Sequence, residues 1–182
     1  MYKITSNENY ERINLDKLKK KIKINLEEIN KKRKIPKRLK VWERITEYGE
    51  VMWCTDHSYI GKKNRRDVKR VISYDKKLNP DLLWFERYIN DFYFGPEPGK
   101  DDRDFRKGET LDIIAKTVAV LIYQLEKIEG REYIITIDLV NDTRLFDKEV
   151  EVFLHFYEVR KDCYESYKHF RDGADIRVDI CN

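Results

Sequence analysis

The chain has 182 residues, of which 40% are charged, 41% are hydrophobic and 13% are aromatic. The apolar fraction is too high for a disordered chain, and seven glycines and four prolines exclude collagen-like or low-complexity sequence. A chain of this length can bury a sizeable core within one domain. We therefore expect a folded protein with a single α+β domain over residues 1–182.

Charge is distributed unevenly along the chain. The 38 Lys and Arg residues and 34 Asp and Glu residues leave a net charge of only +4. Residues 1–78 contain 23 basic and 11 acidic side chains, whereas residues 79–182 contain 15 and 23. The sequence thus predicts a basic N-terminal helical region and an acidic helix-plus-sheet region. The two regions either neutralise each other in the fold or present opposite charge to different partners.

The cysteines and the apolar segments narrow the class of protein further. Cys54, Cys163 and Cys181 are widely spaced, which argues against a disulfide framework and a thiolate zinc site. The N-terminus lacks a signal-peptide core, and no apolar run approaches the roughly 20 residues that span a bilayer. We therefore expect a cytoplasmic protein without membrane contact. Its wealth of Lys, Ile, Asn and Tyr suggests an AT-rich bacterial genome.

The first predicted element is a helix over residues 15–33. Asn14 is a suitable N-cap, and apolar residues recur every three or four positions from Leu15 to Ile29. Lysines fill most of the remaining positions, and Pro36 prevents the helix from continuing. The pattern therefore indicates an amphipathic helix with a lysine-rich outer face.

The middle of the chain gives weaker patterns. Residues 37–60 combine a short helical pattern with an extended one, and Gly49 separates the two. Residues 67–77 have the spacing of a short helix. The Asn-Pro pair at 79–80 then predicts the cap and first turn of an aromatic-rich helix that ends at Gly95.

The C-terminal part gives the clearest patterns. A continuous apolar stripe over 110–129, capped by Thr110, predicts the central core helix. Alternating apolar residues over 133–139 and 150–156 predict a β-hairpin, and residues 174–180 predict a further strand. We therefore expect helices packed on one face of a C-terminal antiparallel sheet of three or more strands.

The sequence contains no recognisable catalytic motif. His57, His155 and His169 are far apart, and His57 lies next to an aspartate and a serine on an extended segment where neighbouring side chains point to opposite faces. His155 falls on the same strand face as Phe153 and Tyr157, which predicts a packed or half-exposed sheet histidine. We favour a noncatalytic protein and keep open an enzyme whose site has no sequence motif.

One carboxylate cluster could coordinate a hard divalent cation. Asp101, Asp102, Asp104 and Glu109 lie close together in sequence, but they lack EF-hand spacing and basic residues interleave with them. This pattern is typical of a solvated charged loop. We therefore expect neither a metal ion nor another cofactor.

The aromatic residues between positions 84 and 94 exceed what one helical stripe can bury. Exposed Trp, Tyr and Phe side chains are common anchors in protein interfaces, and an acidic stretch follows them in this chain. Such a surface is complementary to a basic partner. The predicted partner-binding residues are Trp84, Tyr88, Tyr93, Glu97, Asp101, Asp102 and Asp104.

These observations favour a noncatalytic protein-binding module, of the immunity or antitoxin type, that inhibits a basic nuclease toxin. An acidic, aromatic-edged surface can occlude a nuclease by imitating phosphates. The alternative hypothesis is sequence-nonspecific nucleic-acid binding through phosphate contacts of the lysine-rich N-terminal region. The residues predicted for that alternative are Lys19, Lys20, Lys23, Lys32, Arg33, Lys63, Arg65 and Arg66.

Overall fold

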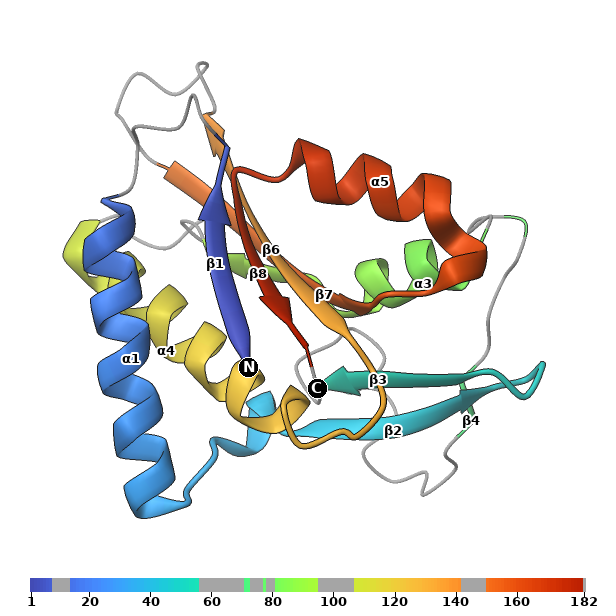
Figure 1. Ribbon diagram of the computed structural model, residues 1–182, viewed down its shortest axis with the longest axis horizontal. Coiled ribbons are helices and arrows are strands. Elements are labelled where there is room, and N and C mark those ends of the chain that lie inside the picture. Colours follow the sequence, from blue (N-terminus) through green and yellow to red (C-terminus); the bar gives the residue numbers. More distant parts are fainter. Residues whose placement is uncertain are drawn as a thin grey trace, which may run out of the picture.

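The computed structural model describes residues 1–7, 14–55, 71–72, 77, 81–94, 107–141 and 150–181. Within these residues the chain forms an α+β structure with two sheets (Figure 1). The large sheet is antiparallel throughout and has the strand order β1-β8-β6-β7-β5. Its strands are β1 (Tyr2–Ser6), β5 (Phe92–Phe94), β6 (Tyr133–Asn141), β7 (Val150–Glu158) and β8 (Ile176–Ile180).

The centre of the large sheet confirms the predicted C-terminal strands. β6 and β7 pair as the expected hairpin, with Thr136 opposite His155 and Asp138 opposite Phe153. β8 pairs with β6 on one side and with β1 on the other. Because β1 and β8 are antiparallel, the chain ends meet, and Met1 and Cys181 exchange two backbone hydrogen bonds of 2.9 Å (Figure 1).

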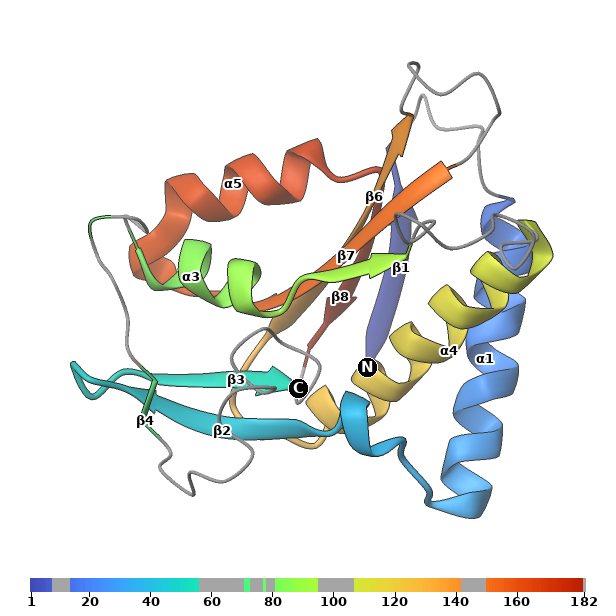
Figure 2. The same ribbon diagram turned by 180° about the vertical axis from the view of Figure 1, so that it is seen from behind.

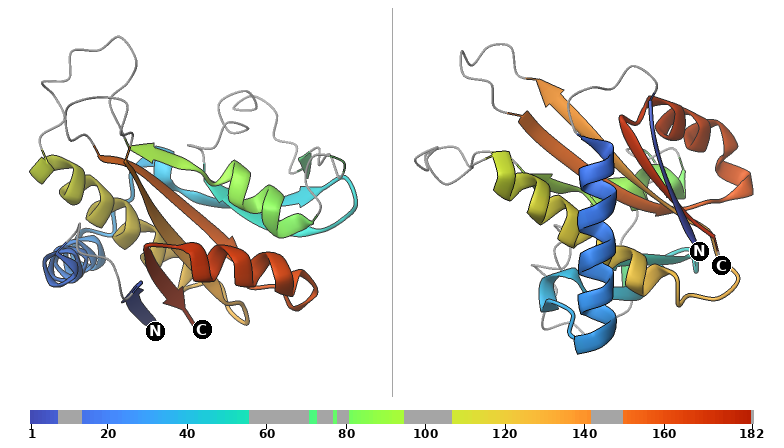
Figure 3. Two further views of the ribbon diagram at one scale, coloured as in Figure 1. Left: turned by 90° about the horizontal axis from the view of Figure 1, so that it is seen from above. Right: turned by 60° about the vertical axis from the view of Figure 1, so that its left-hand side comes forward.

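Two long helices cover one face of this sheet. They are α1 (Leu15–Lys32) and α4 (Lys107–Leu125). Asn14 caps α1 as predicted, because its side chain accepts a 2.9 Å hydrogen bond from the Lys17 backbone N–H. The apolar stripe of α1 packs on α4, and α4 in turn packs on the sheet (Figure 3). This position between two layers explains why α4 is apolar on several sides.

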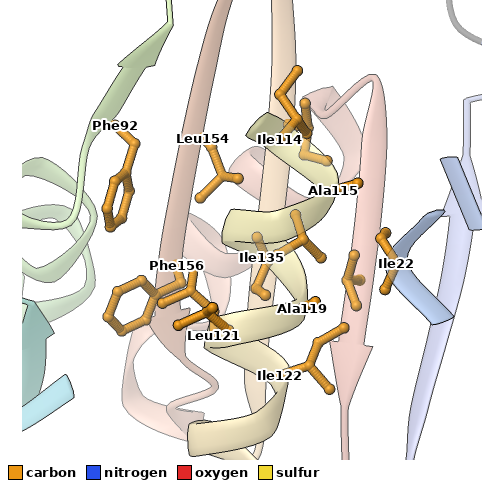
Figure 4. Close-up of a cluster of buried hydrophobic side chains, with 14 of the residues drawn as sticks. Ile22, Phe92, Ile114, Ala115, Ala119, Leu121, Ile122, Ile135, Leu154 and Phe156 are labelled. Carbon is orange, nitrogen blue, oxygen red and sulfur yellow. The ribbon is translucent and has the colours of Figure 1, made fainter. Parts of the chain in front are cut away.

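The main core lies between α4 and the large sheet. In Figure 4 the side chains of α4, among them Ala119 and Leu121, lie between Ile22 of α1 and the sheet residues Ile135 and Phe156. All five are at most 1% exposed. The predicted role of α4 as the central core helix is therefore confirmed.

The opposite face of the large sheet is also covered by helices. These are α3 (Leu82–Ile89) and α5 (Tyr164–Gly173), with a 3₁₀ turn, η3 (Lys161–Cys163), before α5 (Figure 2). Leu83 of α3 and Phe170 of α5 form a second core with Ile134 and Tyr157. The prediction of helices on one face only is therefore wrong. The central strands bury apolar side chains on both of their faces, so both faces need a cover.

The small sheet has the order β3-β2-β4 and lies beside the large one. β2 and β3 form an antiparallel hairpin whose turn contains Gly49 at φ +82°, a left-handed conformation that glycine adopts without strain. The side-chain amide of Gln124 in α4 ties the start of β2 to the core, since it accepts from Val41 N at 2.9 Å and donates to Leu39 O at 2.8 Å. The elements are η1 (Lys37–Leu39), β2 (Val41–Thr46), β3 (Val51–Thr55) and β4 (Val71–Ile72).

Several sequence predictions in the first half need correction. The helical pattern after position 40 belongs to strand β2, and Val71–Ile72 form a strand parallel to β2 instead of part of a helix over 67–77. The remaining residues of that predicted helix lie outside the described ones, apart from Lys77 in a turn. Branched apolar residues at spacings of three and four suit a short helix or a half-buried strand, and tertiary pairing decides between them.

Two helix boundaries also differ from the prediction. α3 begins after Asp81, whose carboxylate accepts a 2.9 Å hydrogen bond from Trp84 N, and it ends at Ile89. Phe92–Phe94 then pair with β7 as an edge strand instead of extending the helix to Gly95. Thr110 lies inside α4 and is not its cap, because α4 already begins at Lys107.

Candidate functional site

The outer face of α3 carries a row of polar and aromatic side chains. Trp84, Arg87, Tyr88 and Asp91 follow the spacing i, i+3, i+4 and i+7, so they point to one side of the helix and the turn after it. The opposite side of α3 is buried, with Leu83 at 0% exposure. The fold therefore fixes this row at the edge of the large sheet.

The sheet strands beneath α3 and α5 contribute a second set of polar side chains. Asp138 lies on β6, and Phe153 and His155 lie on β7, on the face opposite the main core. The two-residue period of a strand places these side chains on the same face as Ile134 and Tyr157. This face is apolar at one end, where α3 and α5 cover it, and polar at the other.

The two sets meet in an open cleft of about 600 Å³ between α3, α5 and the large sheet. This volume falls within the roughly 300–1,000 Å³ of ligand pockets. We call this feature the acidic cleft. Its lining residues are Trp84, Arg87, Asp91, Asp138, Phe153, His155, His169, Phe170, Gly173 and Asp175.

His155 lies between two carboxylates of the acidic cleft. Its Nδ1 atom is 3.5 Å from Asp91 Oδ1, and its Nε2 atom is 3.8 Å from Asp138 Oδ2. Asp138 also forms an ion pair with Arg87, with 3.3 Å between Oδ2 and Nη2. The four charged or titratable groups thus form one connected cluster drawn from α3, the turn after it, β6 and β7.

Burial sets the protonation of these groups. It lowers the pKa of His155 to about 3, with the positive charge of Arg87 adding to the effect and a hydrogen bond to the Arg87 backbone opposing it. Burial also raises the pKa of Asp91 and that of Asp138, while Arg87 opposes both rises. At neutral pH His155 is therefore an uncharged imidazole, and Arg87 only partly compensates the aspartates around it.

One atom of the cluster lacks a partner. The side chain of His155 is only 6% exposed, and its Nδ1 atom has no hydrogen-bond partner among the described residues. A buried polar atom without a partner costs free energy, and such atoms are rare in native proteins. His155 is thus an unsatisfied group in the wall of an open cleft, and a ligand atom reaches its Nδ1 only when the side chains around it shift.

Aromatic rings form the remaining walls. The Trp84 ring packs edge-on against Phe170 with centroids 4.5 Å apart, and the guanidinium of Arg87 lies 4.5 Å from the centroid of the same Phe170 ring. On the other side Tyr93 of β5 packs against Phe153 at 5.2 Å. The acidic cleft therefore combines carboxylates with ring faces.

A separate buried network joins the small sheet to the large one. The carboxylate of Glu86, which is fully buried, accepts from Trp53 N at 3.4 Å, from Glu158 N at 3.1 Å and from Arg160 Nη2 at 3.3 Å. Burial raises the pKa of Glu86, while Arg160 and the two backbone donors oppose that rise. Asn90 adds a 2.8 Å hydrogen bond to Trp53 O. These groups face away from the acidic cleft and hold the fold together.

The structure brings together part of the predicted partner-binding set. Trp84 lines the acidic cleft and is 37% exposed, Tyr88 is 61% exposed on the same side of α3, and Tyr93 is 39% exposed beside Phe153. The remaining predicted partner-binding residues lie outside the part of the chain that the structure describes: Glu97, Asp101, Asp102 and Asp104.

The residues of the nucleic-acid alternative form a less uniform surface where they are described. Lys20 and Lys23 are exposed on α1, and Lys19 is half-buried. Lys32 pairs with Glu28, and Arg33 is exposed at the left-handed C-cap of the helix. Lys63, Arg65 and Arg66 lie outside the described residues, as does His57.

Sequence reasoning missed the charged part of the cleft, which is Arg87, Asp91, Asp138 and Asp175 together with His155. The spacing of Trp84, Arg87, Tyr88 and Asp91 on one helical face was a usable signal. The alternation of β6 and β7 places Asp138 and His155 on the non-core face. Their approach to Asp91 depends on strand pairing with β5 and on where α3 docks, and no local pattern contains that information.

The described residues contain neither a group of three His, Cys, Asp or Glu side chains placed to hold a metal ion nor a helix long and apolar enough to cross a membrane. Comparison with protein-family models, with curated proteins and with solved structures finds no match to the chain. The functional argument therefore depends on the geometry of the acidic cleft.

Proposed function

We propose that the chain is a noncatalytic protein-binding module whose acidic cleft docks a basic protein partner. The observation that carries this proposal is the cluster of Asp91, Asp138 and Asp175 in an aromatic-walled cleft, with Arg87 as the cation among the described lining residues. His155 adds no positive charge at neutral pH. Because the two carboxylates of Asp91 and Asp138 face the single guanidinium of Arg87, a positively charged group is the ligand that the cleft favours electrostatically.

The rim of the cleft supports a protein as the partner. Trp84, Tyr88 and Tyr93 are large aromatic side chains with a third or more of their surface exposed. Aromatic side chains of this kind are enriched at the centres of protein interfaces, where they supply much of the binding energy. A rim of aromatic rings around a charged cleft thus supports contact with a protein surface that extends beyond the cleft itself.

The electrostatics support one class of partner in particular. A nuclease carries a basic surface for phosphates, and carboxylates in a fixed arrangement are complementary to it. We therefore propose an immunity or antitoxin-type inhibitor that acts by stoichiometric contact with a nuclease toxin in the bacterial cytoplasm. In this proposal the acidic cleft contacts the phosphate-binding side chains of the toxin and excludes its substrate.

Purified partner and defined variants test the proposal. A partner captured from the source organism would be produced separately and mixed with this chain, and light scattering would give the stoichiometry. We expect a one-to-one complex with a basic protein, inhibition of its nuclease activity, and at least tenfold weaker binding by Tyr88→Ala and Asp91→Asn. Lys20→Glu, on the far side of the large sheet, is the matched control. A complex that persists in both cleft variants and is lost with the control would contradict the proposal.

Nucleic-acid binding through α1 is a second candidate, favoured by the exposure of Lys20, Lys23 and Lys31. Glu27 and Glu28 interrupt this surface, which weakens its attraction for phosphates. A salt titration with nonspecific DNA and RNA tests it, because phosphate contacts give a steep loss of affinity with salt. Tight binding that is lost in the Lys20→Glu, Lys23→Glu double variant would favour this candidate over the first.

Acid–base catalysis is a third candidate, favoured by the convergence of Asp91 and Asp138 on His155. A general base works best with a pKa near the working pH, and a pKa of about 3 makes His155 a weak base at neutral pH. Hydrolytic activity that disappears in His155→Gln, while the variant stays folded, would favour this candidate.

A further inference from the structure

We propose that the acidic cleft recognises a guanidinium group, supplied by an arginine side chain of the protein partner, beside Asp91 and His155. This inference rests on the proposed function and specifies which chemical group of the partner enters the cleft. It follows from three features of the described residues: a pair of neighbouring acceptor atoms, a guanidinium already held by the same cleft, and the aromatic rim.

The first feature is the pair formed by Asp91 Oδ1 and His155 Nδ1, which are 3.5 Å apart. The described structure places no hydrogen-bond partner on this imidazole nitrogen, although its side chain is only 6% exposed. A guanidinium carries five N–H donors in a fixed planar fork and no acceptor. In the neutral tautomer that carries its proton on Nε2, Nδ1 is an acceptor. Such a fork can therefore donate to the Asp91 carboxylate and, once the enclosing side chains shift, to this nitrogen as well.

The second feature is Arg87, which shows how the cleft accommodates a guanidinium. Its Nη2 atom contacts Asp138 Oδ2 at 3.3 Å while its guanidinium lies over the Phe170 ring at 4.5 Å. Arginine is suited to this combination of a carboxylate and a ring face, whereas the lysine ammonium is a compact and strongly hydrated charge. Asp91 lies beside Nδ1 of His155, and the Phe153 ring stacks on the imidazole with centroids 6.4 Å apart, so a carboxylate and an aromatic ring are also present next to His155.

The third feature decides the source of the guanidinium. A small free guanidinium compound would occupy the cleft and leave the rim rings Trp84, Tyr88 and Tyr93 exposed. An arginine on a protein surface brings neighbouring residues that cover these rings. The rim therefore favours a partner protein over a free metabolite, in agreement with the composition of protein interfaces.

The test uses NMR on the full chain with isotope-labelled histidine and tryptophan. The probes are N-acetyl-arginine amide, N-acetyl-lysine amide and N-acetyl-citrulline amide, the last of which matches arginine in shape without its charge. We expect saturable shifts of the His155 imidazole and Trp84 indole signals with the arginine probe. We expect at least tenfold weaker binding of the lysine probe and no saturation with the citrulline probe.

Two variants complete the design. Asp91→Asn should weaken the arginine probe at least tenfold, whereas Asp112→Asn, on the opposite side of the large sheet, should leave its affinity unchanged. Equal binding of arginine and citrulline, equal binding of arginine and lysine, or full affinity in Asp91→Asn would each overturn the inference. The selectivity among probes is measured on the unchanged protein, so it does not depend on whether a variant folds.

The outcomes also separate this inference from the proposed function. If the arginine probe fails while the basic partner still binds in a manner sensitive to Tyr88→Ala, the guanidinium site is wrong and the protein-binding proposal stands. If the partner binds without dependence on Tyr88 or Asp91, the proposed function itself is wrong.

Discussion

At the scale of single residues, the defining property of the acidic cleft is a buried imidazole that stays neutral beside two carboxylates. Desolvation is the largest cause of the low pKa of His155, and the charge of Arg87 adds to it. We therefore expect its imidazole signals to show no protonation step between pH 5 and 8 in an NMR titration. An inflection near 6.5, the ordinary value for histidine, would contradict the burial of this side chain.

Asp91 should serve binding more than stability. Because burial raises its pKa in the folded state, ionised Asp91 disfavours folding at neutral pH, and protonation removes that cost. The side chain is 41% exposed, so the effect is small. We expect Asp91→Asn to leave the free energy of unfolding within about 0.5 kcal/mol of the original protein in urea titrations. A loss of several kcal/mol would show that Asp91 is a structural residue.

The affinity of the cleft for a cation should fall in acid. The pKa of Asp91 and that of Asp138 are both raised above 3.8, and only the ionised forms attract a cation. Arg87, Asp175 and His169 are the other charged or titratable side chains that line the cleft. We expect the affinity for the arginine probe to be constant at high pH and to decline with an apparent pKa above 3.8. A decline centred below 3.8 would contradict the assignment.

Glu86 is the contrasting case, a buried carboxylate with a structural role. Glu86→Ala leaves the backbone N–H groups of Trp53 and Glu158 without their acceptor, while Arg160 keeps Glu158 and Val51 O as partners. Since each unsatisfied buried donor costs about 1–3 kcal/mol, we expect a loss of that order. Glu86→Gln keeps one acceptor oxygen and should cost less. Urea unfolding of the two variants checks the order of these losses, and equal stability of Glu86→Ala and the original protein would exclude the structural role.

At the scale of elements, the arrangement depends on α1 packing against α4. Ile22 is fully buried in this contact, whereas Ile24, two positions further, is 53% exposed. We expect Ile22→Ala to lower the free energy of unfolding by about 2–5 kcal/mol, because it removes buried methyl groups and leaves a cavity. Ile24→Ala is the matched control and should change it by less than about 0.5 kcal/mol. Similar losses in both variants would contradict the observed orientation of α1.

The elements that local pattern predicted well are those whose periodicity is uninterrupted. The apolar stripes of α1 and α4 and the alternation in β6, β7 and β8 define these elements within a few residues. Strands β4 and β5 were missed because they are short and pair with distant segments, whereas β2 was missed because its apolar residues also fit a short helix. The helices on the second face of the sheet were also not predicted. Ile134 and Tyr157 on that face are buried by the docking of α3 and α5, which the local pattern does not specify.

The same reasoning explains which part of the candidate site the sequence could predict. The sequence pointed to Trp84, Tyr88 and Tyr93 because residues 84–94 contain more aromatic side chains than one helical face can bury. Asp138 and His155 gave no such signal, because a polar residue on one face of a strand is ordinary in a sheet with a solvated side. Their meeting with Asp91 is a property of tertiary structure.

At the scale of the whole molecule, the described charges are separated by the large sheet. The lysine-rich helix α1 lies on one face of the sheet, and α3 and α5 lie on the other (Figure 3). Side chains of α3, α5 and the sheet line the acidic cleft on that second face. Lys21 pairs with Asp112 across the basic and acidic regions, whereas Arg87 and Arg131 pair with Asp138 and Glu158 of their own region. Together with the ion pair between the Met1 amine and Glu126, the Lys21–Asp112 pair shows that the two regions neutralise each other in part along α4.

The most direct test of this account is chemical-shift mapping of the labelled chain in complex with its purified basic partner. We expect the largest changes at Trp84, Tyr88, Asp91 and His155, with little change along the outer face of α1. Changes concentrated at Lys20 and Lys23, with the acidic cleft unaffected, would contradict the central claim that the cleft is the binding site.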